Sequence, residues 1–141
     1  MTPPIARLLI VDDELPSMRA LCDTLQDQGY ETAGFTSGEA ALEAMQDQRF
    51  DLLLTDLMMP KMSGFVVIER IKQAKDSLIP VVMLTANDNE YQKAFAEVLG
   101  VDAFLHKPIG AKELLAQINK LCPVRDSQAI DCDHKTPDTA F

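Results

Sequence analysis

The chain has 141 residues, of which 47% are hydrophobic and 25% charged, so its composition is that of a globular domain with one core. No apolar run approaches the ~20 residues that a membrane-spanning helix needs. The formal net charge is −9 and Lys and Arg form no cluster, which argues against direct contact with nucleic acid or an anionic membrane.

The first seven residues have neither a basic lead nor a long apolar stretch, so we expect no secretory signal and a cytoplasmic location. The three cysteines, Cys22, Cys122 and Cys132, are too few for a disulfide framework. We expect them to be reduced, with Cys22 acting as a small hydrophobe on the apolar stripe of a helix.

Five candidate strands alternate with five helical patterns along the chain. The first and third strands are continuous apolar runs, which is typical of strands buried on both faces of a parallel sheet. In chain order the expected strands are Leu8–Val11, Tyr30–Phe35, Leu52–Thr55, Val81–Leu84 and Ala103–Leu105.

Between these strands apolar residues recur at helical spacing. The first helix follows residues 12–14, has Pro16 in its first turn and ends near Gly29. Ser37 is suited to cap the second helix, and the fourth helix is expected to stop at Gly100. The expected inward-facing residues are Met18, Leu21, Cys22, Leu25, Ala41, Leu42, Met45, Val67, Ile68, Ile71, Leu114, Leu115, Ile118 and Leu121.

This alternation predicts an α/β fold, a doubly wound sandwich in which helices cover both faces of a five-stranded parallel sheet. We assign residues 1–122 to this domain. The last residues, 123–141, are polar and have no apolar face, so we predict a flexible tail or the start of a linker there.

Several residues with reactive or charged side chains follow the expected strands. Asp12 and Asp13 come directly after the first strand, and Asp56 comes directly after the third. Thr85 follows the fourth strand and Lys107 follows the fifth. Ligands of open parallel sheets bind beyond the carboxyl ends of the strands, so we expect these five side chains to converge there.

Three carboxylates so close together would repel one another unless a divalent cation lay among them. Oxygen ligands without His or Cys favour Mg²⁺, with Mn²⁺ as the alternative, over Zn²⁺. Mg²⁺ usually takes phosphoryl oxygens at its open positions, and Lys107 can bind the same group. Asp56 ends the central strand, so we expect it to be the nucleophile that forms an acyl phosphate.

Four segments extend this pattern: Leu9–Glu14, Asp51–Gly64, Pro80–Ala86 and Phe104–Pro108. In this order and spacing they resemble the receiver domain of two-component response regulators, over Ile5 to about Cys122. The resemblance implies a flavodoxin-like (βα)5 fold with strand order 2-1-3-4-5. It also implies that the chain is a signalling phosphoacceptor and not an enzyme. Such a phosphoacceptor assists its own phosphorylation and dephosphorylation.

The resemblance assigns roles to the acidic residues. Asp56 would receive the phosphoryl group from a sensor histidine kinase or a phosphotransfer protein. Asp12 and Asp13 would bind Mg²⁺ together with Asp56, Asp13 the more directly, and the backbone carbonyl of Met58 would complete the protein ligands.

The resemblance also implies a switch. Thr85 would be the hydroxyl that closes onto the phosphoryl group, Lys107 would pair with that group, and the Lys107–Pro108 bond would be cis. Phe104 stands where the family often has Tyr, so its ring can rotate but cannot donate a hydrogen bond to the fourth loop.

In the family, the face built from the fourth helix, fifth strand and fifth helix commonly repacks on phosphorylation, to dimerise or to dock a partner. Tyr91, Phe95 and Phe104 are candidates for this face. A homodimer through it would follow from the resemblance.

The main alternative is a phosphorylation-independent, receiver-like protein-interaction module. A flavodoxin-like cofactor carrier would need a hydroxyl- and glycine-rich loop after the first strand, where this chain has three acids at residues 12–14. A phosphatase with an aspartyl nucleophile would usually have a second acid two residues later, where Met58 stands.

Overall fold

The computed structural model describes residues 6–57, 59, 62–73, 79–86 and 90–121. In this part of the chain five strands alternate with five helices, as the sequence predicts. Their bounds are β1 Arg7–Val11, α1 Leu15–Asp27, β2 Glu31–Phe35, α2 Gly38–Asp47, β3 Leu52–Asp56, α3 Gly64–Gln73, β4 Val81–Thr85, α4 Glu90–Leu99, β5 Ala103–His106 and α5 Ala111–Leu121.

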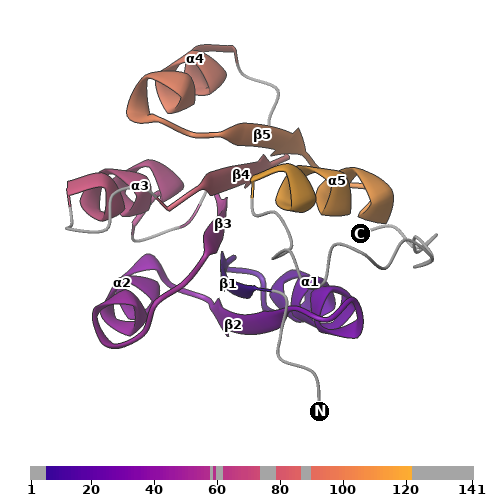
Figure 1. Cartoon of the computed structure of the whole chain (residues 1–141). Helices are drawn as coiled ribbons and strands as arrows, with labels where there is room; N and C mark the ends of the chain where they lie inside the picture. Colours follow the sequence, from indigo (N-terminus) through magenta and orange to yellow (C-terminus); the bar gives the residue numbers. More distant parts are fainter. Residues whose placement is uncertain (1–5, 58, 60–61, 74–78, 87–89, 122–141) are drawn as a thin grey trace.

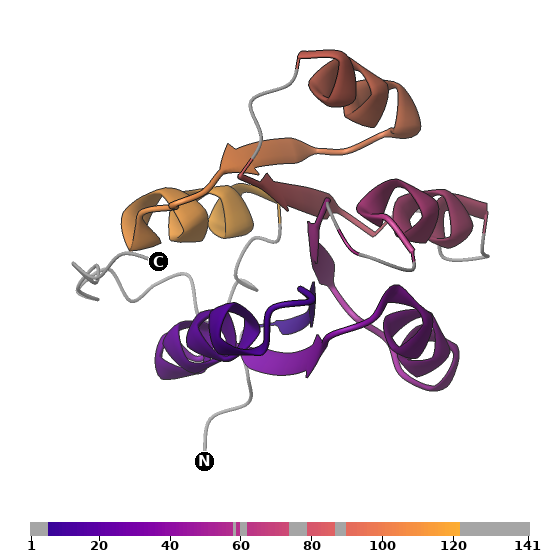
Figure 2. The same ribbon diagram turned by 180° about the vertical axis from the view of Figure 1, so that it is seen from behind.

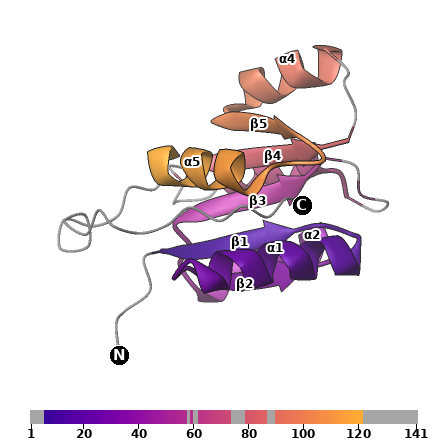
Figure 3. The same ribbon diagram turned by 90° about the vertical axis from the view of Figure 1, so that its right-hand side faces the viewer.

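The strands form one sheet with the order β2-β1-β3-β4-β5, and every neighbouring pair is parallel (Figure 3). Helices α1 and α5 cover one face, whereas α2 and α3 cover the other, with α4 beyond them at the β5 end (Figure 1). The doubly wound α/β fold and the strand order 2-1-3-4-5 are therefore confirmed.

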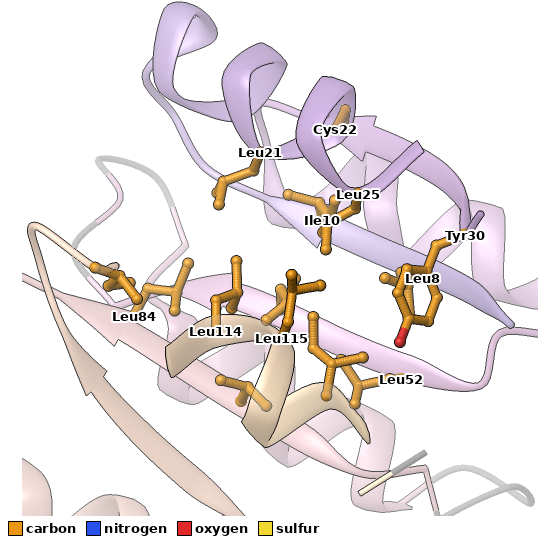
Figure 4. Packing of buried hydrophobic residues seen from close by; sticks show 14 of the residues in the cluster. Leu8, Ile10, Leu21, Cys22, Leu25, Tyr30, Leu52, Leu84, Leu114 and Leu115 are labelled. Carbon is orange, nitrogen blue, oxygen red and sulfur yellow. The ribbon is translucent and has the colours of Figure 1, made fainter. Parts of the chain in front are cut away.

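The core is divided in two by the sheet, because successive residues of a strand face opposite sides. On β1, Leu8 and Ile10 contact the α1 and α5 side, while Leu9 and Val11 contact the α2 and α3 side. All four are fully buried, which explains why the run is apolar without alternation. Figure 4 shows the first side, where side chains of α1 and α5 meet over β1 and β3.

Helix α2 begins and α1 ends near the residues that the sequence indicates, Ser37 and Gly29. The Ser37 hydroxyl accepts a hydrogen bond of 3.2 Å from the Ala40 N–H at the start of α2. Gly29 follows α1 with a φ of 99°, in the left-handed region where glycine has no steric penalty. Each strand differs from its expected bounds by one residue: β1 starts at Arg7, β2 starts at Glu31, and β3, β4 and β5 end at Asp56, Thr85 and His106. The start of β2 shifts because the Tyr30 N–H donates to the Leu25 carbonyl and so belongs to the end of α1.

The predicted inner faces of the helices are largely confirmed. The buried residues of α1 are Met18, Leu21, Cys22 and Leu25, and Cys22 is a free thiol. Cys122, Cys132 and the predicted tail lie outside the described residues, so those predictions stay open. None of the helices that the structure describes has the length and apolar character to cross a membrane.

Replacing Tyr30 by phenylalanine should destabilise the domain by ~0.5–1.5 kcal/mol. The Tyr30 hydroxyl donates a 3.0 Å hydrogen bond to Asn119 Oδ1 and thereby links the connection between α1 and β2 to α5. Urea unfolding of Tyr30→Phe, Asn119→Ala and the double variant would measure this coupling. Strictly additive effects of the two substitutions would contradict the prediction.

Candidate functional site

The residues singled out in the sequence follow four neighbouring strands at one edge of the sheet. Asp56 is the last residue of β3, Thr85 is the last of β4, and Lys107 directly follows β5. Asp12 follows β1, and its backbone N–H donates a 3.0 Å hydrogen bond to the carbonyl of Phe35, which holds it at the tip of the ladder. Parallel pairing alone brings these positions to a common edge.

The three acids meet at this edge, as the sequence predicts. Asp12, Asp13 and Asp56 each offer one carboxylate oxygen, and these atoms all lie within 4.8 Å of one another. Asp12 is fully buried and Asp56 is 8% exposed, while Asp13 is the most exposed of the three. An all-oxygen donor set with one side open to water suits Mg²⁺, which keeps several of its own waters.

Lys107 lies against the acids. Its Nζ is 2.8 Å from Asp12 Oδ2 and 3.9 Å from Asp56 Oδ1. The other oxygen of Asp12 accepts a 3.0 Å hydrogen bond from the Glu14 N–H, so the buried carboxylate has a partner on both sides. The sequence brings Lys107 to the site but does not indicate that Asp12 is its nearest partner.

The position of Asp56 makes its negative charge costly. Burial raises the pKa of Asp56 to about 6; the Lys107 ammonium and the Leu57 N–H lower it, whereas the charges of Asp12 and Asp13 raise it. A cation among the three carboxylates would oppose the last effect and favour the ionised form.

Lys107 keeps its proton because its acidic neighbours stabilise the ammonium form. Burial lowers the pKa of Lys107, but the hydrogen bond to Asp12 and the charges of Asp12, Asp56 and Glu14 outweigh burial, so the pKa is raised overall. At neutral pH the site therefore presents a fixed positive charge beside the Asp56 carboxylate.

Thr85 is fully buried, and its carbonyl accepts a 2.7 Å hydrogen bond from the Lys107 backbone N–H. The tips of β4 and β5 are thus tied together next to the acids. Phe104 pairs with Met83 across the same two strands and is partly buried against the core on the α2 and α3 side. The Lys107–Pro108 bond is cis, as the resemblance implies. Met58 lies outside the described residues.

Gly64 has a role that the sequence analysis does not assign. It is the first residue of α3, and its N–H donates a 2.9 Å hydrogen bond to the carbonyl of Leu57. A Cβ at this position would overlap the carbonyl oxygen of Asp56 and lie 3.1 Å from the Leu57 Cα. The start of α3 therefore rests on the backbone of Asp56, and only a residue without a side chain fits there.

Replacing Gly64 by alanine should lower the free energy of unfolding by ~1–3 kcal/mol, because the added methyl group meets backbone that cannot turn away. Gly110 is the matched control, since a Cβ there would meet nothing within 4 Å. Urea unfolding of Gly64→Ala and Gly110→Ala measures the difference. Equal stabilities of the two variants would refute this account of Gly64.

Comparison with known proteins agrees with this geometry. A family model described as the response regulator receiver domain matches residues 8–119. The chain is 33% identical over 115 residues to the alkaline phosphatase synthesis transcriptional regulatory protein PhoP of Bacillus subtilis, covering 82% of this chain and 48% of that protein. It is 39% identical over 111 residues to the sensory transduction protein RegX3 of Mycobacterium tuberculosis, covering 79% and 48%.

The chain thus spans about half the length of the curated relatives it matches. Among solved structures, the chemotaxis protein CheY4 of Vibrio cholerae superposes with a TM-score of 0.80 at 30% identity, covering 83% of this chain and 98% of that one. A response regulator receiver protein of Pseudomonas putida gives a TM-score of 0.77 at 28% identity, covering 85% and 98%. The chain therefore belongs to the response regulator receiver domain family, whose members work in two-component signalling.

Proposed function

We propose that this receiver domain is a phosphoacceptor in which Asp56 takes a phosphoryl group, with Mg²⁺ held by Asp12, Asp13 and Asp56. The observation that carries the proposal is the convergence of three carboxylate oxygens within 4.8 Å, with the Lys107 ammonium beside them. The donor is a histidine kinase or a phosphotransfer protein, as the relationship to response regulators supports.

The chemistry follows from these side chains. A carboxylate oxygen of Asp56 attacks the phosphorus, the bond from phosphorus to the leaving group of the donor breaks, and its electron pair leaves with the donor. Mg²⁺, when bound, would neutralise charge on the phosphoryl oxygens. Lys107 stays protonated, so its ammonium is available to the same oxygens without a change of protonation state.

The switch in this proposal uses the tips of β4 and β5. Thr85 supplies the hydroxyl that follows the phosphoryl group, and its backbone bond to Lys107 supports concerted movement of the two strand ends. Phe104 is the aromatic that changes burial, and its partly buried position is compatible with movement in either direction. The output face is then α4, β5 and α5, through which the domain forms a homodimer or docks a partner.

Phosphorylation is tested by incubating the chain with acetyl phosphate and Mg²⁺ and measuring intact mass. We expect one added phosphoryl group, lost in Asp56→Asn and on chelation of Mg²⁺. Asp47→Asn is the control: Asp47 is an exposed acid at the end of α2, near the opposite end of the strands, and its variant should react like wild type. Folded wild-type protein that gains no phosphoryl group would instead support the phosphorylation-independent interaction module.

The relatives also bear on the output. The B. subtilis protein is named a transcriptional regulatory protein and is about twice as long as the aligned region. We propose that the receiver likewise controls an output carried by another domain or another protein. The net charge of −9 and the lack of a Lys and Arg cluster support placing any nucleic acid contact outside this domain, which we expect to act in the cytoplasm.

A further inference from the structure

Helix α4 has fewer buried residues than α2 or α3, the helices on the same side of the sheet. Ala96 is its one buried residue among the described ones, whereas α3 buries Gly64, Val67, Ile68 and Ile71. Tyr91 and Val98 are 88% and 81% exposed. Figure 2 shows α4 at the β5 end of the sheet, beyond the other helices. Elements with few buried apolar contacts open locally at low free energy, so α4 is the helix best suited to move.

One aromatic contact holds α4 to its neighbour. The rings of Phe65 and Phe95 meet edge to face, with centroids 4.8 Å apart and planes at 84°. Phe65 lies in the first turn of α3, and α3 is the element that α4 contacts most. Phe95 is 50% exposed, so about half of its surface is covered by neighbouring residues.

The other end of this contact leads directly to the phosphoacceptor strand. Phe65 follows Gly64, whose N–H donates to the Leu57 carbonyl and where a Cβ would overlap the Asp56 carbonyl oxygen. A displacement of the Leu57 backbone would therefore act directly on the first turn of α3, and on Phe65 with it.

We propose that the Phe65–Phe95 pair is a latch that couples the backbone of Asp56 and Leu57 to the docking of α4. This inference rests on the proposed function: phosphorylation changes the site at Asp56, and α3 transmits that change to the latch. This route runs through β3 and α3, so it is separate from the switch through Thr85 and Phe104. Two arrangements of α4, latched and released, would be biased by whether Asp56 carries a phosphoryl group.

The latch itself is tested without any ligand by hydrogen–deuterium exchange of peptides covering residues 90–99. Phe65→Leu and Phe95→Leu should each speed exchange in α4 by about two- to twelvefold, the range expected for one aromatic pair. The double variant should exchange no faster than the faster single one. Val98→Leu is the matched control, because Val98 is on the same helix but 81% exposed, and its exchange in α4 should be no faster than that of wild type.

Exchange in α1, residues 15–27, reports global opening and should be unchanged in every variant. If Phe65→Leu loosens the whole domain, Phe95→Leu carries the test, because its ring is half exposed and its loss leaves the core intact. The latch is overturned if α4 of Phe95→Leu exchanges at the wild-type rate, or if Val98→Leu speeds exchange in α4 as much as Phe95→Leu does.

Coupling is tested by repeating the exchange after treatment with acetyl phosphate and Mg²⁺, with intact mass confirming the phosphoryl group in each variant. We expect phosphorylation to change exchange in α4 of wild type, and this change to shrink at least about twofold in both latch variants. An α4 response that is absent in phosphorylated wild type, or equal in the variants, overturns the coupling. Failure of wild type to take the phosphoryl group would refute the proposed function instead, and the ligand-free comparison would still decide on the latch.

Discussion

Replacing Asp56 by asparagine should stabilise the domain above pH 7, in the absence of divalent ions, by up to ~3 kcal/mol. Burial raises the pKa of Asp56 from its ordinary value of 3.8 to about 6, so the folded state binds the proton more tightly than the unfolded chain. The amide carries no charge and avoids both the burial of that charge and its repulsion from Asp12 and Asp13. The carboxylate is thus kept at a cost to stability.

The sign of the pH dependence follows from the direction of this shift. Below pH ~3, under both pKa values, Asp56 is protonated in the folded and the unfolded chain, so it contributes no penalty. As the pH rises towards 6, the unfolded chain loses the proton first, and the stability of wild type falls relative to the variant. Above pH ~7 the penalty is complete and constant.

Urea unfolding followed by circular dichroism, at several pH values and one ionic strength, measures this difference. We expect Asp56→Asn to exceed wild type at pH 7.5 and to approach it near pH 4. Asp47→Asn, at an exposed position, should stay within ~0.5 kcal/mol of wild type throughout. A variant no more stable than wild type at pH 7.5 would show that the site does not destabilise the charged form.

Replacing Asp13 by asparagine should weaken Mg²⁺ binding by at least about tenfold. Groups that only orient a metal ligand already contribute about 10–100-fold to affinity, so loss of a ligand should cost no less. Asp13 is the most exposed of the three acids, which makes its substitution the least disruptive to the fold. Asp12 is a poorer choice, because its removal would leave Lys107 without the partner at 2.8 Å.

Isothermal titration calorimetry with Mg²⁺, supported by electron paramagnetic resonance with Mn²⁺, measures this affinity. Asp47→Asn has the same change of charge near the far end of the sheet and should bind like wild type, which separates ligation from general electrostatics. Equal affinity of Asp13→Asn and Asp47→Asn would remove Asp13 from the metal site.

Much of the fold follows from local features of the sequence. The apolar runs of β1 and β3 predict strands buried on both faces, because helices cover both sides of a parallel sheet. Ser37 and Gly29 mark helix boundaries through interactions within a few residues. Strand order is different: periodicity contains no information on which strands are neighbours, so the order came from the resemblance and was then confirmed.

That the acids lie at one edge could be predicted because parallel strands end at the same edge; that they meet there also depends on β1 and β3 being neighbours. Which charge lies nearest to which could not be predicted. The 2.8 Å contact between Asp12 and Lys107 joins residues 95 positions apart, and side-chain geometry decides it. The raised pKa of Asp56 depends mainly on burial by surrounding elements.

Periodicity, and the position of polar residues after apolar runs, were enough to predict the secondary structure elements, the parallel α/β architecture and the residues at the strand tips. The close approach of Gly64 to the Asp56 carbonyl and the contact between Phe65 and Phe95 could be seen in the folded chain alone. Both contacts join separate elements, and packing between elements is set by the shape of the whole core and not by any local pattern.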